Sequence, residues 1–179
     1  MSSSVLYAFT LLTTIGYGNI TPTTLLGQAF TMVYGVVGIP LFLIAIADLG
    51  RFFKTGVMSV IQFCCTTDLI KKPEEHRMCR ELAEVFLVSF VFIGFIAVGS
   101  AFLTIWEQDL SYFDSVYFSY ISLTTIGLGD IVPRRSEFMI ITLIYITVGL
   151  WLTTAVVEQM ADVFKLVHYA GRRVGNVKG

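Results

Sequence analysis

The hydrophobic residues of this chain are gathered into five apolar stretches, which polar and charged segments separate. Three of the stretches, over 25–47, 84–106 and 138–161, have the length of about 20 residues that a helix needs to cross a bilayer. The other two, over 4–13 and 113–124, are too short to cross. A half-length helix at membrane depth is tolerated only where it packs inside protein or faces water. The pattern therefore predicts an all-α membrane protein with three transmembrane helices and two short re-entrant helices.

The composition of the chain agrees with a membrane protein. Apolar residues make up 55% of its 179 residues and charged residues only 14%, whereas soluble domains carry about 25% charged residues. The net charge of −1 argues against nucleic acid as a partner. The three cysteines, Cys64, Cys65 and Cys79, have the spacing of neither a zinc site nor a disulfide framework. No loop combines a nucleophile with a base, so we do not expect an enzyme.

The basic residues predict the orientation of the chain in the membrane. Ten of the twelve Lys and Arg residues lie in 48–83 or in the tail after 161, and the other two are Arg134 and Arg135. Lys and Arg are enriched in cytosolic loops, so 48–83 and the C-terminus are predicted to be cytosolic in a multi-pass plasma-membrane protein. No predicted span carries the arginine ladder of a voltage sensor. Glu158, near the end of the third span, is either a solvated helix end or a charge at the cytosolic mouth.

The chain contains an internal repeat. When it is shifted against itself by 111 residues, 10 of the 19 positions in 4–22 are identical to those in 115–133, with no gap. Each copy consists of a short apolar helix, a glycine loop (TTIGYGN at 13–19 and TTIGLGD at 124–130) and a spanning helix. Identities continue at the same offset into the spanning helices. The repeated unit is therefore a helix, a loop and a span together.

The two glycine loops allow three interpretations. A dinucleotide-binding loop needs a third glycine after a strand, but Thr21 and Val132 occupy that position and apolar spans surround both loops. A simple turn does not require Thr-Thr-Ile ahead of the glycines in both copies. A pore lining needs carbonyls that point the same way, and glycine at every second position supplies the required alternation because it reaches positive φ without a Cβ penalty. The two loops are thus predicted to line a narrow pore.

At these residues the chain resembles the two-pore-domain potassium channel family. The TIGYG and TIGLGD sequences are similar to its two selectivity filters, in which carbonyl oxygens replace the hydration shell of K⁺. The resemblance implies that K⁺ binds to filter backbone carbonyls and to the hydroxyls of Thr14 and Thr125, with no other metal and no cofactor. The implied filter residues are Thr14, Ile15, Gly16, Tyr17, Gly18, Thr125, Ile126, Gly127, Leu128 and Gly129.

The resemblance extends to residues around the loops. Asn19 and Asp130 follow the two filters and are expected at the outer mouth, where Asp130 would concentrate cations. Gly38, Pro40 and Gly149 resemble hinge or kink residues of the family's inner helices. Leu128 lacks the hydroxyl of Tyr17, so the ring of four filter strands should be only pseudo-fourfold. This ring implies a homodimer, or a heterodimer with a related subunit, in the bilayer.

The repeat also sets the expected domain boundaries. The predicted units are a first pore domain over 1–54, a cytosolic linker over 55–83, a second pore domain over 84–166 and a cytosolic tail over 167–179. The first pore domain lacks the outer helix and extracellular cap of the family, and we interpret the chain as a fragment or truncated form. The predicted function is a potassium-selective leak channel subunit. The alternative is a non-conducting truncated subunit that pairs with full-length channels and modulates them.

Overall fold

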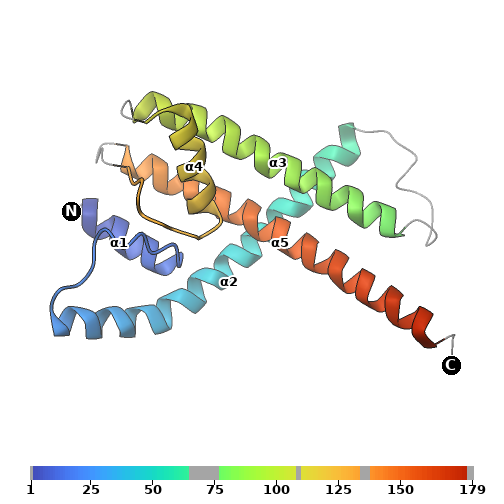
Figure 1. The fold of residues 1–179 in the computed structure, drawn as a ribbon, viewed down its shortest axis with the longest axis horizontal. Helices are drawn as coiled ribbons and strands as arrows, with labels where there is room; N and C mark the ends of the chain where they lie inside the picture. Colours follow the sequence, from blue (N-terminus) through green and yellow to red (C-terminus); the bar gives the residue numbers. More distant parts are fainter. Residues whose placement is uncertain (1, 65–76, 108–109, 134–137, 177–179) are drawn as a thin grey trace.

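The structure is a computed structural model that describes residues 2–64, 77–107, 110–133 and 138–176, and the described residues form five helices. The expectations for Cys65, Arg134, Arg135 and residues 65–76 of the cytosolic linker lie outside this range. Figure 1 shows how the helices are arranged. They are α1 (Ser2–Leu12), α2 (Leu25–Cys64), α3 (Arg77–Trp106), α4 (Tyr112–Leu123) and α5 (Met139–Asn176).

The predicted all-α membrane fold is confirmed. Three helical segments are long and apolar enough to cross a membrane: Leu25–Gly56, Leu82–Trp106 and Met139–Lys165. The long helices extend beyond the predicted spans. Helix α2 runs to Cys64, and α3 begins at Arg77, inside the predicted linker. Polar residues do not end a helix that leaves the bilayer, since its backbone hydrogen bonds are satisfied within the helix.

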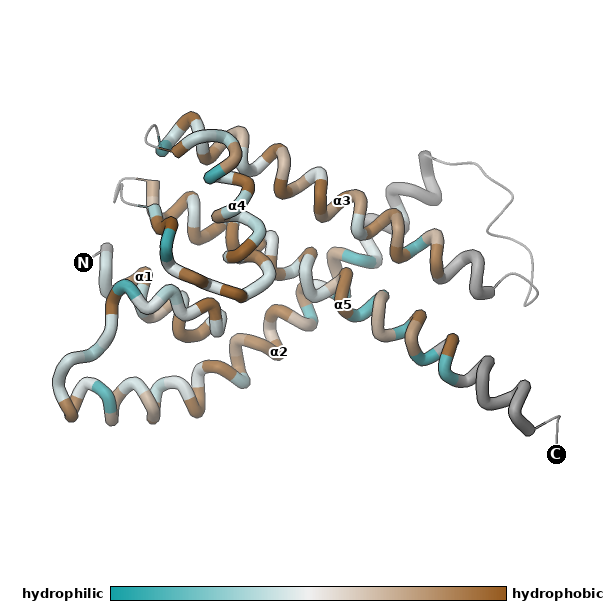
Figure 2. Tube along the Cα trace, in the orientation of Figure 1, coloured by the Kyte–Doolittle hydropathy of each residue, from teal (hydrophilic) through white to brown (hydrophobic). Residues whose placement is uncertain are grey.

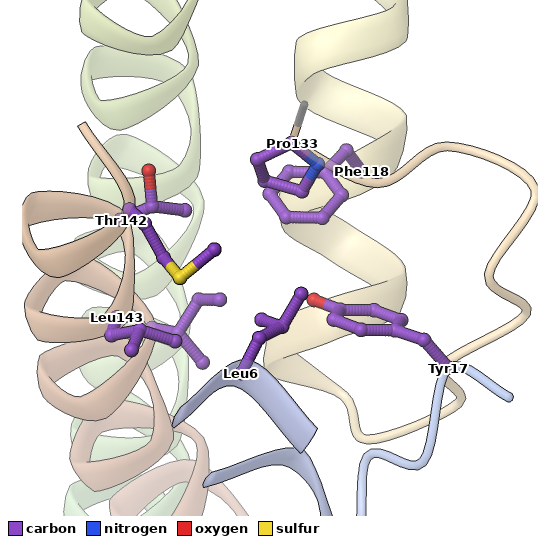
Figure 3. A pocket seen from close by; sticks show the side chains of 8 residues that line it. Leu6, Tyr17, Phe118, Pro133, Thr142 and Leu143 are labelled. Carbon is purple, nitrogen blue, oxygen red and sulfur yellow. The ribbon is translucent and has the colours of Figure 1, made fainter. Parts of the chain in front are cut away.

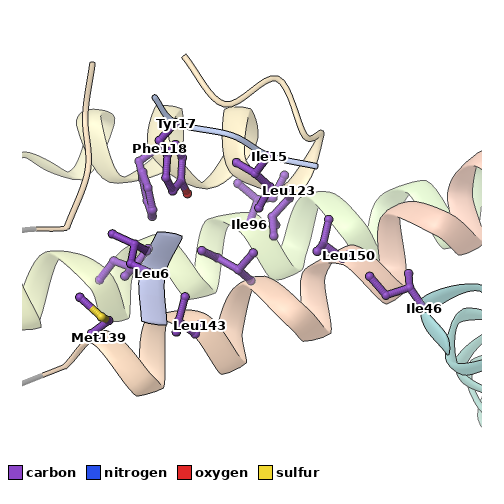
Figure 4. Packing of buried hydrophobic residues seen from close by; sticks show 12 residues of the cluster. Leu6, Ile15, Tyr17, Ile46, Ile96, Phe118, Leu123, Met139, Leu143 and Leu150 are labelled. Atoms are coloured by element: carbon purple, nitrogen blue, oxygen red, sulfur yellow. The ribbon is translucent and has the colours of Figure 1, made fainter. Parts of the chain in front are cut away.

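Helix α5 lies at the centre of the fold, and α2 and α3 pack against it. The short helix α4 lies against α3 and α5, whereas α1 lies between α2 and α5. Figure 4 shows that the core joins the two repeats, since Leu6 and Tyr17 of the first lie close to Phe118 and Leu143 of the second. The two copies of the repeat thus share one hydrophobic core.

Helix α2 is the least buried of the three spanning helices. Figure 1 shows that it changes direction along its N-terminal half, and Pro40 lies inside it. A proline within a helix removes one backbone hydrogen bond and its ring clashes with the preceding turn, which bends the helix. Figure 2 shows the apolar character of the spanning helices. The exposed apolar side chains of α2 include those of Phe30, Val33, Val36, Val37, Leu41 and Ile44.

An ion pair joins α2 and α5. Arg51 Nε donates to Glu158 Oε1 over 3.2 Å. The preceding residue, Gly50, lies against the carbonyl oxygen of Trp151, which a Cβ would meet at 3.1 Å, so the glycine allows the two helices to approach closely. Exposed ion pairs contribute only about 0–1 kcal/mol. Glu158 thus forms an ion pair between α2 and α5, which neither interpretation from the sequence anticipated.

Candidate functional site

The two glycine loops leave their short helices through the same backbone turn. In the first loop the Gly16 N–H donates to the Thr10 carbonyl over 3.1 Å, and in the second the Gly127 N–H donates to the Ile121 carbonyl over 3.0 Å. These four residues are equivalent under the 111-residue repeat. The repeat in the sequence is therefore also a repeat of backbone hydrogen bonds.

Backbone angles in both loops alternate in hand. Gly16 and Gly18 have φ of 61° and 76°, and Gly127 and Gly129 have φ of 59° and 74°. Positive φ at every second position is the alternation that the glycine spacing predicts. The structure adds a third position that the sequence did not indicate. Thr14 and Thr125 both have φ of 57°, although a threonine in the left-handed region is strained.

The two loops lie directly against each other. A Cβ added to Gly127 would overlap the carbonyl oxygen of Ile15 and lie 2.7 Å from its carbonyl carbon. A Cβ added to Gly129 would likewise overlap the carbonyl oxygen of Tyr17 and lie 2.9 Å from its carbonyl carbon. These glycines are thus required for the close approach of one loop to the other, in addition to their positive φ.

Equivalent residues of the two loops differ in burial. Ile15 and Tyr17 are 3% and 5% exposed, whereas their equivalents Ile126 and Leu128 are 51% and 61% exposed. Around Gly16 and Gly18, by contrast with Gly127 and Gly129, a Cβ would find nothing within 4 Å. Each loop therefore has one covered and one open side. In the first loop the side chains are covered and the glycine side is open. In the second loop the first loop covers the glycine side, whereas the side chains are exposed within the described part of the chain.

Tyr17 connects the first loop to the short helix of the second repeat. Its hydroxyl lies 2.6 Å from Ser122 Oγ, and its ring centroid lies 6.1 Å from that of Phe118. Burial raises the pKa of Tyr17 to about 12, and the hydrogen bond with Ser122 opposes this effect. Figure 3 shows Tyr17 beside Phe118 and Leu6 at a small apolar pocket behind the loops. The tyrosine was predicted from the sequence, but its partner Ser122 was not.

Polar side chains hold α4 behind the second loop. Helix α4 begins with a capping box, in which the Asp114 N–H donates to Ser111 Oγ and the Ser111 N–H donates to the Asp114 carboxylate. Deeper in the fold, Ser100 of α3 donates to the carbonyl of Ser115, and Ser119 donates to the same carbonyl over 2.7 Å. These three serines are fully buried, so each hydrogen bond offsets the desolvation of a hydroxyl.

The predicted hinge glycines are packing sites in this structure. A Cβ at Gly149 would lie 2.7 Å from Leu123 Cδ1 and 3.0 Å from its Cγ. A Cβ at Gly38, the equivalent residue, would contact the side chain of Leu12, which is equivalent to Leu123. In both repeats the glycine thus admits the last leucine of the short helix against the spanning helix. Motion about Gly38, Pro40 or Gly149 stays a prediction.

The residues predicted at the outer mouth are exposed. Asp130 accepts a hydrogen bond from the Tyr117 hydroxyl over 2.9 Å, and this bond raises the pKa of Tyr117. Tyr117 was not predicted, and the repeat gives no signal for it because its equivalent is Leu6. Asn19 occupies the equivalent position in the first loop, so only the second loop carries a carboxylate at this position.

The loops offer oxygen atoms as potential ligands for a cation. Among the residues that the structure describes, no three or more His, Cys, Asp or Glu side chains are grouped to hold a metal ion. The groups available along the loops are backbone carbonyls and hydroxyls, which suit a weakly held hard cation. The Thr14 hydroxyl donates to the Thr13 carbonyl over 2.7 Å, and this bond uses its proton but not its oxygen lone pairs.

Comparison with known proteins identifies relatives of the chain. A family model described as "Ion channel" matches residues 1–55 and 85–165. The chain is 30% identical to "TWiK family of potassium channels protein 9" of Caenorhabditis elegans, over 99% of the chain and 43% of that relative. It is 32% identical to "TWiK family of potassium channels protein 7" of the same organism, over 99% of the chain and 35% of the relative. The chain thus spans less than half the length of these curated relatives.

Proposed function

The chain belongs to the two-pore-domain potassium channel family, within the ion channel family whose model it matches, and from this premise we propose that it is a subunit of a potassium-selective leak channel. The pore is formed by two subunits, which together contribute four filter strands. The permeant ion is K⁺, held by the backbone carbonyls of the two loops and by the hydroxyls of Thr14 and Thr125. No cofactor is needed for this conductance.

The observation that carries the proposal is the unequal cover of the two loops. Ile15 and Tyr17 are buried against the second repeat of the same chain, whereas Ile126 and Leu128 are exposed. Within the chain Gly127 and Gly129 of the second loop receive the first loop, whereas nothing lies within 4 Å of a Cβ at the equivalent Gly16 and Gly18. A second copy, related by a two-fold axis, would place its second loop there and would accept this chain's second loop in return.

A ring of four loops supplies the chemistry of cation conduction. Each loop has positive φ at every second position from Thr14 to Gly18 or from Thr125 to Gly129, which lets successive carbonyls point to one side. Rings of carbonyl oxygens at several levels replace water around K⁺, and neighbouring sites let ions leave as well as enter. The C-terminal ends of α1 and α4 lead into the loops, and their partial negative charge favours a cation.

The proposed conductance is a background leak at the plasma membrane. The three spans carry no arginine ladder, so no segment of the kind that senses voltage is present in them. We place the loops on the outer side, with 48–83 and the C-terminus in the cytosol, because ten of the twelve basic residues lie in the latter segments. A leak of this kind draws the membrane potential towards the potassium equilibrium potential.

The proposal is tested by electrophysiology and labelling in cells without background potassium current. We expect channels that contain this chain to give a current whose reversal potential follows the potassium gradient and changes little with sodium. Epitope tags at the C-terminus should be reached by antibody only after permeabilisation. A current that does not distinguish potassium from sodium, or a C-terminal tag labelled on intact cells, would contradict the function or the orientation respectively.

A further inference from the structure

The side chain of Leu128 is exposed, whereas its equivalent in the first loop is buried in a contact within the chain. Under the 111-residue repeat, Leu128 is equivalent to Tyr17, and Ser122, the partner of Tyr17, is equivalent to Leu11. We infer that, in the dimer of the proposed function, Leu128 of each subunit packs against Leu11 and Tyr7 of the other subunit. This contact is apolar where the contact within the chain is a hydrogen bond.

The contact within the chain defines the geometry. Tyr17 lies between Ser122 Oγ, at 2.6 Å from its hydroxyl, and the ring of Phe118, at a centroid distance of 6.1 Å. The same contact includes the approach of Gly129 to the carbonyl of Tyr17. The tyrosine of the first loop therefore contacts two positions of the neighbouring short helix that are one helical turn apart.

The repeat predicts an equivalent contact between two subunits. In a pseudo-fourfold ring, the second loop of one chain faces the first short helix of the other, as the first loop faces the second short helix within one chain. Tyr17, Ser122 and Phe118 are then replaced by Leu128, Leu11 and Tyr7. Leu128 is 61% exposed, and Leu11 and Tyr7 are only half-buried, so all three have surface left to lose.

The chemistry of the three residues is matched. The side chain of Leu128 has no hydrogen-bond donor or acceptor. Leu11, which stands where the other repeat has a serine, needs no hydrogen-bond partner. The Tyr7 hydroxyl lies 2.8 Å from Thr31 Oγ1, so its hydrogen-bonding need is met away from the contact and its ring serves as an apolar wall. A tyrosine at position 128 would instead bury a hydroxyl against Leu11 without a partner.

In this arrangement the two filter strands are held in place by different kinds of contact. The first is fixed within its own chain by a directional hydrogen bond, and the second is held by apolar packing on the other chain. Apolar contacts are not directional, so the second strand depends on dimer assembly for its position. Leu11 and Leu128 thereby become residues that determine which chains pair with each other.

The experiment exchanges the two anchors between chains. Leu11→Ser and Leu128→Tyr are placed on separate chains with different tags and co-expressed. In either homodimer both contacts are mismatched, whereas in the mixed dimer one contact is Tyr–Ser and the other is the natural Leu–Leu. We expect mixed dimers to rise from the random share of about half to roughly nine in ten of all dimers, as a buried unpaired hydroxyl is worth about a tenfold change or more.

The matched control uses the equivalent pair within the chain. Tyr17→Leu and Ser122→Leu on separate chains should co-purify at the random share, because mixing chains cannot repair a contact that lies within each chain. The milder pair Leu11→Ala and Leu128→Phe, which exchanges volume in place of polarity, repeats the test where the polar variants do not accumulate. Mixed dimers should again be enriched.

The outcomes separate this inference from the proposed function. If wild-type chains with different tags co-purify but the exchanged variants pair at random in both tests, the Leu11–Leu128 contact is wrong while the four-strand pore stands. If wild-type chains never co-purify, the dimeric pore and the contact are both overturned. Neither readout uses potassium current, so a failure of conductance alone is detected separately.

Discussion

Gly127 lies so close to the carbonyl group of Ile15 that a Cβ on the glycine would overlap the carbonyl oxygen. Gly16, its equivalent in the first loop, has nothing within 4 Å of the same position. Both glycines have almost the same φ, 59° and 61°, so an alanine at either position meets the same backbone strain. The two sites differ only in what surrounds them.

This difference predicts unequal effects of alanine at the two positions. In the isolated subunit, Gly16→Ala should cost about 1–2 kcal/mol, from left-handed strain alone. Gly127→Ala should cost more, because the first loop must also move away. Thermal unfolding in detergent under monomeric conditions measures the difference. In the assembled channel both variants should lose preference for potassium over sodium, and unchanged selectivity in Gly127→Ala would show that the second loop does not line the pore.

Removal of the Tyr17 hydroxyl should destabilise the chain and change its response to alkaline pH. Tyr17→Phe leaves Ser122 Oγ buried without this partner, at a cost of about 1–3 kcal/mol. Ser122→Ala should cost a similar amount, and the double variant less than the sum. Chemical denaturation of the three variants gives the coupling energy, and additive costs would mean that the bond contributes nothing.

The pKa of Tyr17 reports the burial of its side chain, because desolvation raises the pKa and the hydrogen bond with Ser122 opposes the rise. Because its pKa in the folded chain is raised to about 12, the folded state binds more protons than the unfolded state between the ordinary value near 10 and 12. Stability contributed by this group is therefore fully present below pH 10 and is lost as the pH rises to 12. The difference in stability between wild type and Tyr17→Phe should shrink over this interval, and a constant difference would contradict the assignment.

Alanine at Gly149 should be more damaging than alanine at Gly38. Leu123 is fully buried and cannot turn away from a new Cβ at Gly149, whereas Leu12 is only half-buried and can turn away from one at Gly38. We expect Gly149→Ala to lower stability by about 1–3 kcal/mol, as overpacking does, and Gly38→Ala by less. Leu123→Ala should partly rescue Gly149→Ala, and a lack of rescue in thermal unfolding would point to a different role for the glycine.

The carboxylate of Asp130 should raise conductance only at low ionic strength. Asp130→Asn removes a negative charge from the proposed mouth and should lower single-channel conductance in dilute potassium chloride, with little effect near 1 M, where the screening length is about 3 Å. Asn19→Asp is the matched gain-of-charge variant and should have the opposite effect. A decrease that persists unchanged at high salt would indicate that Asp130 acts through its hydrogen bond with Tyr117.

The elements, the repeat and the special backbone of the loops follow from local features of the sequence. Apolar length identified the spans, since a helix in lipid has to satisfy its own backbone groups. The glycine spacing predicted positive φ at Gly16, Gly18, Gly127 and Gly129, because this preference belongs to the residue itself. The positive φ of Thr14 and Thr125 was not predictable in this way, because threonine does not favour it and only the surrounding loop imposes it.

Which member of each repeated pair is buried depends on contacts between segments that are distant in the sequence. Ile15 and Ile126 stand in identical TTIG sequences, yet one is 3% and the other 51% exposed. Likewise, Tyr17 and Ser122 meet across 105 residues of sequence, and no local pattern links a tyrosine to one particular serine. Periodicity and propensity act over a few residues, whereas burial depends on which segments the folded chain brings alongside, and an exact repeat assigns the same local preference to both copies.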